Sequence, residues 1–371
     1  SRKFEIKELT TLKNKLNKKK NELNKPYKTK RYYNLSKIPS LGKISSKIKY
    51  NYYNKYNAIN VTNAWLKIYE IIDYYKLIDN TSTTFRYFDN AAFPGSFILA
   101  VNHYVNTIKL NTSLEWYGSS YIGVNELEDQ YLLYKNYPNN WTMSKNNNGD
   151  IRNIKVILDI VKRISTKVDF YTSDLGINVD IKLPNKKSGW DYQEELHANG
   201  NLGQVLLGLL ILKKSKHMVI KMYTFFTSRS VSLLAILTTL FKNVYISKPE
   251  FSAIRSSEIY LVCKEYKGHS YFNNTGLYEK IITRLDDKYN NLSPIVTREC
   301  ITEKFIKNII EYHTFLSKRQ ILSINKKLDV FYNKIKIKDL PPITLPSFLY
   351  TIKKISKSKL LNVKNIYSNK F

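Results

Sequence analysis

The sequence predicts an α/β protein built on a mostly parallel sheet with one antiparallel strand. Between residues 60 and 266, apolar segments of strand length alternate with longer segments of helical periodicity. This alternation is typical of parallel strands joined by crossover helices on both faces of a sheet. The connection between the last two predicted strands contains Pro249 and is too short for a crossover helix, so one of these strands should be antiparallel. We expect a basic N-terminal arm and a helical C-terminal extension around this core.

The first half of the core begins with a predicted helix over Val61–Ile78, because Trp65 and Ile72 fall on one apolar face. The elements expected after it are a strand at Thr84–Asp89, a helix at Gly95–Tyr104, a strand at Leu114–Tyr121, a helix at Ile151–Ile164 and a strand at Val168–Asp174. A polar segment rich in Tyr and Asn, about residues 123–149, interrupts this series. We assign no structure to that segment.

The second half continues the alternation and then becomes helical. Its predicted elements are a helix at Glu194–Leu212, a strand at His217–Met222, a helix at Ser228–Phe241, and strands at Val244–Ser247 and Glu258–Glu265. Beyond about Leu277 we expect helices, among them Glu303–Leu316, Leu322–Ile335 and a basic helix over Tyr350–Leu361. The predicted parts are therefore an arm at 1–54, an α/β domain at 55–270 and a basic helical extension at 271–371.

The charge of the chain indicates a polyanionic partner. Lys and Arg number 60 against 30 Asp and Glu, which gives a formal net charge of +30. RNA or DNA is the first candidate for such a partner. An anionic membrane is the second, but no helix shows the required division into a basic and an apolar face, and the apolar runs are too short to span a bilayer. We therefore expect no membrane association.

Cysteine and histidine usage excludes several kinds of site. Two cysteines provide neither a disulfide framework nor a zinc site, and the five histidines lack metal-ligand spacing, so we expect no metal. A reducing compartment fits, and we expect a cytoplasmic location. No secretory signal is visible, and because the chain begins at Ser1 rather than Met we expect a trimmed or processed form.

The N-terminal arm is the most basic segment. Residues 1–50 contain 16 Lys and Arg against 3 acidic residues. Such a run is often a solvated or disordered segment. It can also contact RNA, and the two interpretations are compatible because basic arms often become ordered on binding. We expect Lys13–Tyr33 to contribute RNA affinity but not chemistry.

Four charged residues of alternating sign stand out, one on a predicted amphipathic helix and three at the ends of predicted strands. They are Lys67, Asp174, Lys221 and Glu258. A charge at the tip of a buried strand is unfavourable unless it is paired. Each of these residues alone could form a structural ion pair, but together they suggest one site at one end of the sheet.

A second candidate site is the turn between the first predicted strand and the next helix. Small residues and a glycine at such a turn let the backbone approach a ligand at the carboxyl end of a sheet. Pro94-Gly95-Ser96 alone would also fit an ordinary turn. The sequence lacks the G-x-G-x-x-G fingerprint of dinucleotide-binding proteins. It also lacks the G-x-x-x-x-G-K-[ST] phosphate loop of nucleotide hydrolases, so both classes are unlikely. Asp150 begins another helix, where it can cap the helix or accept a hydrogen bond from an adenine amino group.

Several motifs occur in order along residues 55–266. They are Tyr56–Lys67, Phe93–Ile98, Asn148–Asp150, Gly176–Val179, Gln193–Leu196 and Lys248–Tyr260. This set resembles the FtsJ-like family of S-adenosylmethionine-dependent RNA 2′-O-methyltransferases, and most closely its members from large cytoplasmic DNA viruses. One departure is Ser96, because the family usually has Pro-Gly-Gly at this turn.

The resemblance implies a Rossmann-like methyltransferase fold and a set of site residues. It implies that Lys67, Asp174, Lys221 and Glu258 are catalytic, with Lys221 as the base, Asp174 orienting Lys221 and Glu258 orienting Lys67. Burial and the nearby Lys67 should favour the neutral form of Lys221. The cofactor S-adenosylmethionine would bind with its adenine near Asp150 and its sulfonium near Asp174. The implied cofactor-binding residues are Asp89, Ala91, Ala92, Phe93, Pro94, Gly95, Ser96, Phe97, Asp150 and Asp174.

The function implied by the resemblance is methylation of the first transcribed nucleotide of capped viral mRNA. The partners would be the capped 5′ end of an mRNA and other capping or transcription proteins, in a viral factory or the virion. Two alternatives stay open at this point. One is a ribosomal RNA 2′-O-methyltransferase, and the other is a non-catalytic RNA-binding or scaffold subunit that keeps the fold.

Overall fold

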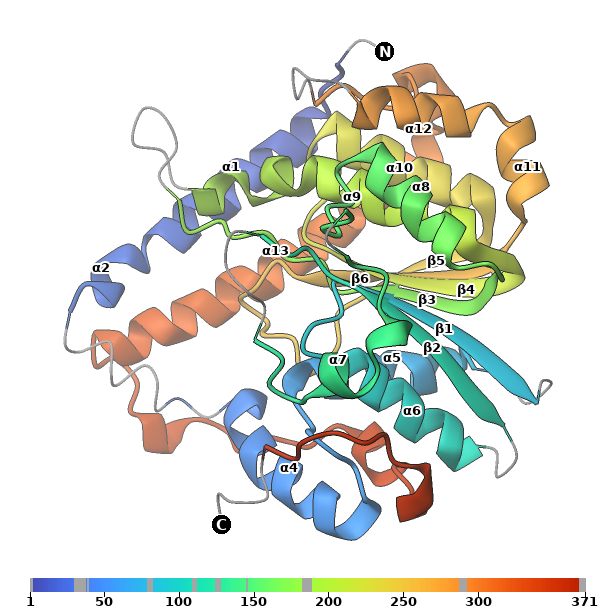
Figure 1. Cartoon of the computed structure of the whole chain (residues 1–371). Coiled ribbons are helices and arrows are strands. Elements are labelled where there is room, and N and C mark those ends of the chain that lie inside the picture. Colours follow the sequence, from blue (N-terminus) through green and yellow to red (C-terminus); the bar gives the residue numbers. More distant parts are fainter. Residues whose placement is uncertain are drawn as a thin grey trace.

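A six-stranded mixed sheet forms the centre of the molecule (Figure 1). The computed structural model describes residues 3–29, 38, 40–78, 83–108, 112–123, 128–144, 146–181, 189–286 and 292–366. The strand order is β2-β1-β3-β4-β6-β5. The strands are β1 (Thr84–Asn90), β2 (Ser113–Ser119), β3 (Val168–Ser173), β4 (Leu212–Met222), β5 (Phe241–Ser247) and β6 (Ile259–Tyr266).

Strand pairing confirms the predicted topology. β1 pairs in parallel with β2 and β3, and β3 pairs in parallel with β4. β6 is antiparallel to both β4 and β5, so it is the antiparallel strand that the short connection at Pro249 predicted. The fold is the Rossmann-like fold of methyltransferases.

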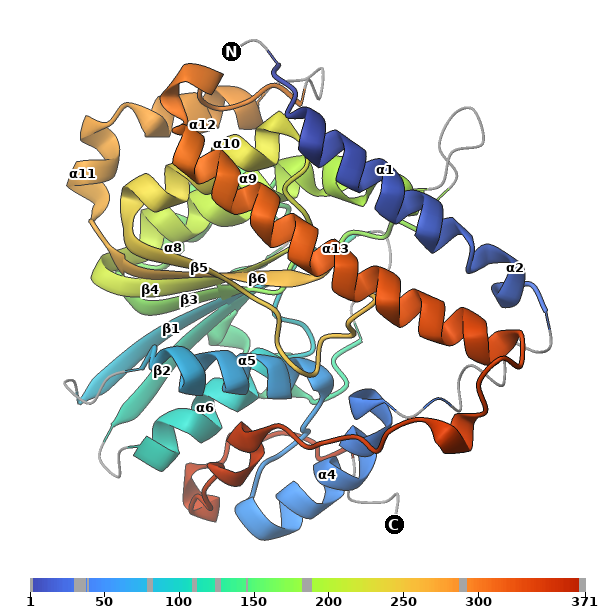
Figure 2. The same ribbon diagram turned by 180° about the vertical axis from the view of Figure 1, so that it is seen from behind.

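Helices cover both faces of the sheet, as Figures 1 and 2 show. One face is covered by α5 (Asn63–Tyr75) and α6 (Ser96–Ile108), and the other by α8 (Ile154–Arg163), α9 (Gln193–Ile211) and α10 (Ser228–Leu240). Successive strand residues therefore enter different cores: Phe170 packs with α5 and α6, whereas Tyr171 packs with α9. Because both cores are apolar, the polar residues of these strands collect at the strand ends.

The remaining elements are short or lie at the two ends of the chain. The helices are α1 (Lys7–Asn21), α2 (Asn24–Tyr27), α4 (Leu41–Tyr56), α7 (Leu133–Asn136), α11 (His269–Asn274), α12 (Leu277–Leu285) and α13 (Glu303–Phe331). Turns of 3-10 helix occur at Pro138–Asn140, Gly189–Tyr192, Arg298–Cys300, Ile337–Asp339, Ser347–Tyr350 and Lys357–Lys359. In its described part, the polar segment at about residues 123–149, to which we assigned no structure, contains the short helix α7 and the 3-10 turn at Pro138–Asn140.

Part of the predicted arm is a helix docked on the domain. α1 packs along α13, with Leu9 and Leu16 buried (Figure 2). Lys13 forms an ion pair with Glu195 at the start of α9. Its charge is therefore paired within the protein, although we expected Lys13–Tyr33 to serve RNA affinity. Lys30–Tyr33, the other basic cluster of the arm, lie outside the described residues.

Two predictions for the C-terminal extension were wrong. The separate helices expected at Glu303–Leu316 and Leu322–Ile335 are one helix, α13, because the polar residues between them include Ser317 and Gln320, which face inward and are buried. The basic helix expected at Tyr350–Leu361 is absent; this described segment is irregular apart from its 3-10 turns.

The irregular tail is held by side chains of the domain instead of by its own helical hydrogen bonds. Asn57 Nδ2 donates to Ile355 O at 2.7 Å, and Asn60 Nδ2 donates to Lys364 O at 2.8 Å. Lys364 N in turn donates to Tyr131 O at 2.8 Å. These contacts compete with helix formation because they use the backbone groups that a helix would pair internally.

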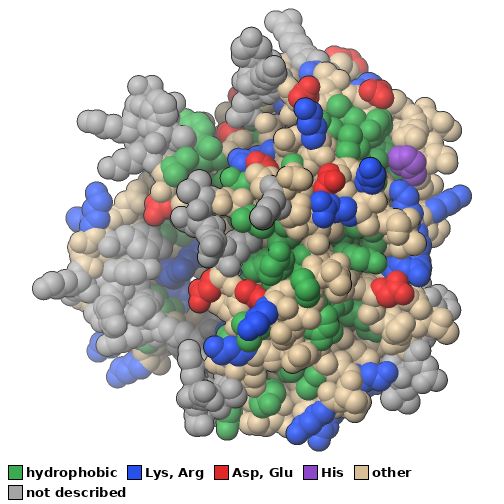
Figure 3. All heavy atoms as spheres, viewed as in Figure 1, with side chains coloured by type: hydrophobic (Ala, Val, Ile, Leu, Met, Phe, Trp, Pro, Cys, Tyr) green, Lys and Arg blue, Asp and Glu red, His purple; other side chains and the backbone are tan. Residues whose placement is uncertain are grey.

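Lys and Arg side chains are scattered over the face seen in Figure 3, with fewer acidic side chains between them. Within the described parts, the helices lack the combination of length and apolar character that crossing a membrane requires.

Candidate active site

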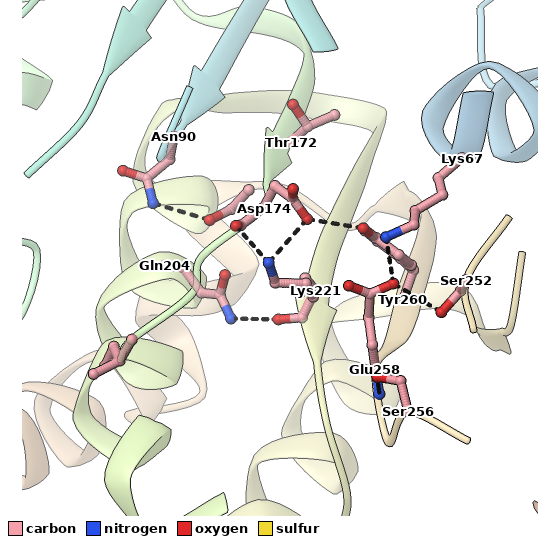
Figure 4. A network of polar contacts seen from close by, with 12 residues as sticks. Lys67, Asn90, Thr172, Asp174, Gln204, Lys221, Ser252, Ser256, Glu258 and Tyr260 are labelled. Atoms are coloured by element: carbon pink, nitrogen blue, oxygen red, sulfur yellow. Dashed lines mark hydrogen bonds and ion pairs between the residues drawn. The ribbon is translucent and has the colours of Figure 1, made fainter. Parts of the chain in front are cut away.

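Four charged side chains meet at the carboxyl end of the parallel strands (Figure 4). Asp174 follows β3, Lys221 is the penultimate residue of β4, Glu258 immediately precedes β6, and Lys67 extends from α5. Lys67 Nζ lies 2.6 Å from Glu258 Oε1, and Lys221 Nζ lies 3.2 Å from Asp174 Oδ1. The structure therefore brings the four predicted residues together as two neighbouring ion pairs.

Strand register explains how the two pairs are placed. The antiparallel pairing of β4 with β6 puts Lys221 opposite Tyr260. The Tyr260 hydroxyl donates to Asp174 Oδ1 at 2.8 Å, the same oxygen that Lys221 approaches. Lys221 Nζ also donates to the carbonyl oxygen of Asp174 at 2.8 Å, and Gln204 Nε2 donates to the carbonyl oxygen of Lys221 at 3.0 Å. Lys221 is thus fixed at both its amine and its backbone.

The sequence analysis missed these supporting residues, although a signal existed for one of them. Tyr260 lies two residues after Glu258, and strand alternation places such residues on the same side of a sheet. Gln204 lies inside an apolar helix, and its spacing gives no indication of its contact with Lys221. Ser252, whose hydroxyl donates to Glu258 Oε1 at 2.8 Å, lies in a loop that no sequence pattern connects to the site.

The protonation state expected for Lys221 was wrong. Burial lowers the pKa of Lys221, but the charges of Asp174, Tyr223 and Glu258 raise it by more, and the net result is a pKa above the ordinary value of 10.5. Lys67 does not act as the expected repelling cation because it is paired with Glu258. Burial raises the pKa of Glu258, but Lys67, Lys221 and Ser252 together bring it below its ordinary value. The site therefore holds a charged lysine and an ionised glutamate.

The turn after β1 lies at the same end of the sheet. Ala92 N donates to Ser119 O at 2.9 Å, and Phe93 N donates to Ser120 Oγ at 2.9 Å, so the turn is attached to the end of β2. Ala91 has a φ of +55° and Gly95 a φ of +111°; the second value favours glycine strongly. The peptide bond between Phe93 and Pro94 is cis.

Not every predicted residue of this turn is available to a ligand. Asp89 is 1% exposed and accepts a hydrogen bond from Thr172 Oγ1 at 2.7 Å. Burial raises the pKa of Asp89 well above its ordinary value, which favours the neutral form of its carboxyl group. The ring of Phe93 packs against Trp141, with centroids 4.6 Å apart, and Phe97 is buried in the core with α5. Ala92 and Gly95 are also buried, so the partly exposed residues of the turn are Ala91, Phe93 and Pro94.

Ser96, the departure from the family pattern, has a local structural partner. Its hydroxyl accepts a hydrogen bond from Thr62 Oγ1 at 3.0 Å and lies 3.3 Å from the hydroxyl of Tyr131. Thr62 caps the N-terminus of α5, the helix that carries Lys67. The serine therefore links the turn to that helix with its side chain turned into the protein.

Asp150 lies beside the end of β2, close to the same turn. Ile122 N donates to Asn148 O at 2.7 Å. Gly149 has a φ of +73°, and a Cβ there would come within 2.0 Å of Ser120 O, so glycine is required. Both carboxylate oxygens of Asp150 accept hydrogen bonds from Arg152 at 2.8 Å. Burial raises the pKa of Asp150, but Arg152 lowers it by more, so this carboxylate is ionised.

Comparison with known proteins agrees with this geometry. The FtsJ-like methyltransferase family model matches residues 60–266. The African swine fever virus protein named "Probable methyltransferase EP424R" is 33% identical over 297 residues, which is 74% of this chain and 65% of the viral protein. The chain thus spans less than two thirds of that relative.

A zebrafish cap-specific mRNA (nucleoside-2′-O-)-methyltransferase 2 is 28% identical over 72% of this chain and 36% of its own length. An uncharacterised protein of Acanthamoeba polyphaga mimivirus is 30% identical over 81% of this chain and 37% of its own length. The match over more than half of the sequence confirms the resemblance, and the chain belongs to the FtsJ-like methyltransferase family.

Proposed function

We propose that this chain is an S-adenosylmethionine-dependent RNA 2′-O-methyltransferase that acts on the first transcribed nucleotide of capped mRNA. The observation that carries this proposal is the pair of ion pairs, Lys67 with Glu258 and Lys221 with Asp174, at the ligand-binding edge of the sheet. A purely structural role would not require two partly buried pairs side by side where the strands end. A methyltransferase needs such groups to align a hydroxyl and remove its proton.

Lys221 is the proposed base for the acceptor hydroxyl. Its amine lies beside Gly176, where a Cβ would be 3.5 Å from Lys221 Nζ and, apart from the flanking residues of the chain, near no other described atom within 4 Å. This open space next to the amine can admit a ribose 2′-hydroxyl. Lys221 must lose a proton before it can accept one, and its hydrogen bonds to Asp174 hold the amine in place for that exchange.

The donor site is proposed from the turn after β1, Asp150 and Asp174. S-adenosylmethionine supplies an activated methyl group when it is bound. The residues fit such a ligand: the backbone of Ala91–Gly95 lies at the strand end, and the carboxylates of Asp150 and Asp174 suit its amino groups and positive charge. Ser119 Oγ, at the end of β2, is buried without a hydrogen-bond partner among the described residues, which suits a polar ligand. Asp89 would support the turn from inside the sheet.

Capped mRNA is proposed as the substrate because of relatives and charge. Zebrafish and fruit-fly relatives are named as cap-specific mRNA (nucleoside-2′-O-)-methyltransferases, and other relatives are viral. The net charge of +30 suits a polyanion. We further propose that residues 55–270 form the methyltransferase domain and that the protein acts in the cytoplasm, where such a virus makes its transcripts.

The test is transfer of labelled methyl groups to a short capped RNA and to the same RNA without a cap. We expect label on the 2′-oxygen of the first transcribed nucleotide of the capped RNA and much less on the uncapped one. Lys221→Met serves as the inactive control. Equal labelling of both RNAs would refute cap specificity. Absence of transfer together with absence of donor binding in calorimetry would favour a non-catalytic subunit.

A further inference from the structure

The backbone segment that carries Glu258 is held by side chains from three separate elements. Lys248, just after β5, donates from Nζ to the carbonyl oxygens of Ser256 at 2.8 Å and Glu258 at 2.6 Å. Glu258 N itself donates to Ser256 Oγ at 3.1 Å. Lys248 therefore fixes the backbone on both sides of Ser257.

Ser257 is held from outside the α/β domain. Lys20 of α1 donates from Nζ to Ser257 Oγ at 2.6 Å. Gln320 of α13 donates from Nε2 to the same hydroxyl at 3.3 Å and to Arg255 O at 3.2 Å. Both helices lie outside residues 60–266, the part that matches the family model. Two distant parts of the chain thus meet on the residue that precedes Glu258.

These contacts are unusual uses of lysine. Within the described residues, neither Lys20 nor Lys248 has a carboxylate at ion-pair distance, and both amines donate only to oxygens of the segment that carries Glu258. Burial lowers the pKa of Lys20 to about 8 and that of Lys248 to about 7. Removing a lysine from water without an ion pair is unfavourable. The arrangement therefore destabilises the charged form of both lysines, while their hydrogen bonds fix the segment that carries Glu258.

We propose that Lys20, Gln320 and Lys248 are positioning residues that hold Glu258 against Lys67, so that helices α1 and α13 form part of the catalytic apparatus. This inference rests on the proposed function. Glu258 Oε1 can stay 2.6 Å from Lys67 only while its backbone is fixed, because the loop around Ser252–Ser257 has no regular structure to fix it. The inference also changes the role expected for the arm, since Lys20 acts through the geometry of the site rather than through RNA affinity alone.

A double-mutant cycle between Lys20→Met and Glu258→Gln tests the proposal on the full chain. Single-turnover methyl transfer is measured at saturating capped RNA and S-adenosylmethionine, together with the RNA concentration at half-saturation. We expect Lys20→Met to slow transfer about tenfold, as loss of one charge-assisted hydrogen bond would, with little change in half-saturation. In the Glu258→Gln background the same substitution should change the rate less than twofold.

Lys18→Met is the matched control, because Lys18 is exposed on the same helix and should leave the rate unchanged. Gln320→Met provides an independent variant from α13, with an expected loss of about threefold that also disappears with Glu258→Gln. It decides the question if Lys20→Met lowers the unfolding temperature so far that the protein is not folded at the assay temperature.

The outcomes separate this inference from the proposed function. Equal losses from Lys20→Met in both backgrounds, or a loss in RNA affinity alone, would overturn the positioning role and leave the active site intact. No loss from Glu258→Gln itself would overturn both, because Glu258 would then have no role to support. A loss of transfer rate from Lys20→Met that disappears in the Glu258→Gln background supports both the positioning role and the proposed function.

Discussion

The charge of Lys221 determines how methyl transfer should depend on pH. Asp174 and Glu258 keep the pKa of Lys221 above 10.5 despite its burial. A lysine with a pKa of 10.5 is neutral in about one molecule in a thousand at pH 7.5, and a higher pKa makes the fraction smaller. If the neutral amine accepts the proton of the 2′-hydroxyl, the single-turnover rate should rise about tenfold per pH unit between pH 6.5 and 9.5. Glu258→Gln removes a charge that raises this pKa, so the rise should end at a lower pH.

Lys221→Ala should remove this rise together with most of the rate. General-base catalysis contributes about 10²–10⁴-fold, so we expect a loss of at least about a hundredfold with donor affinity nearly unchanged. Lys221→Arg should also fail because a guanidinium does not deprotonate in proteins. The larger group would also crowd the space beside Gly176, so failure of the arginine variant is not decisive alone.

Chemical rescue supplies the decisive measurement. A small primary amine added to Lys221→Ala can occupy the vacated space, and transfer should then increase in proportion to the concentration of its neutral form. A pH-independent rate in the wild type, or no rescue by amines of any pKa, would refute proton removal by Lys221. The residue would then be a positioning charge, and the proton would leave to water or another group.

Three further predictions concern other parts of the molecule. Gly176→Ala places a methyl group 3.5 Å from the Lys221 amine, in the space proposed for the acceptor hydroxyl, without a steric clash. It should lower the transfer rate at least about tenfold while the unfolding temperature and donor affinity stay unchanged. Full activity would show that the acceptor does not approach there. His197 and His313 accept backbone hydrogen bonds at 2.9 and 3.0 Å and burial lowers the pKa of each to about 4, so stability present above pH 6.5 should be lost as pH falls toward 4. Each of these histidines should contribute up to about 1.4 kcal/mol per pH unit to the slope of the free energy of unfolding against pH. The slope measured by urea unfolding should therefore fall by about that amount in His313→Gln, and an unchanged slope in that variant would contradict the assignment. Asp89→Asn should change the free energy of unfolding by less than about 1 kcal/mol if the raised pKa keeps the buried carboxyl neutral. A loss above about 3 kcal/mol would show that it is ionised.

The sheet could be predicted from the sequence because its strands are apolar and evenly spaced by helices. β4 shows where this signal fails: it begins at Leu212, five residues before the predicted start at His217, because its first half is partly exposed and rich in lysine. α13 was divided in two because Ser317 and Gln320 look like surface residues, although both are buried. Polarity alone does not show which way a side chain points.

In the candidate site, too, the sequence predicted which residues come together but not the charge state of Lys221. Asp174, Lys221 and Glu258 at strand ends, together with the order of the family motifs, were sufficient to predict that they share one site with Lys67. The direction of the pKa shift of Lys221 was not predictable, because it depends on whether Lys67 faces Lys221 or pairs with Glu258, and a distance of 2.6 Å to Glu258 decides that. Lys20 and Gln320 lie far from Ser257 in the sequence, and only the folded chain brings them together.

The attachment of the C-terminal tail affects when the protein can become active during its synthesis. Asn57 and Asn60 form hydrogen bonds with backbone groups of Ile355, Lys364 and Ile366. These contacts cannot form until a segment about 300 residues later in the chain has been made. Chains fold progressively from the N-terminus as they are made. A fragment ending at the boundary of the family domain would expose the surface that the tail covers and lack α13. We therefore expect the smallest active piece of this protein to be much longer than the domain that defines its family.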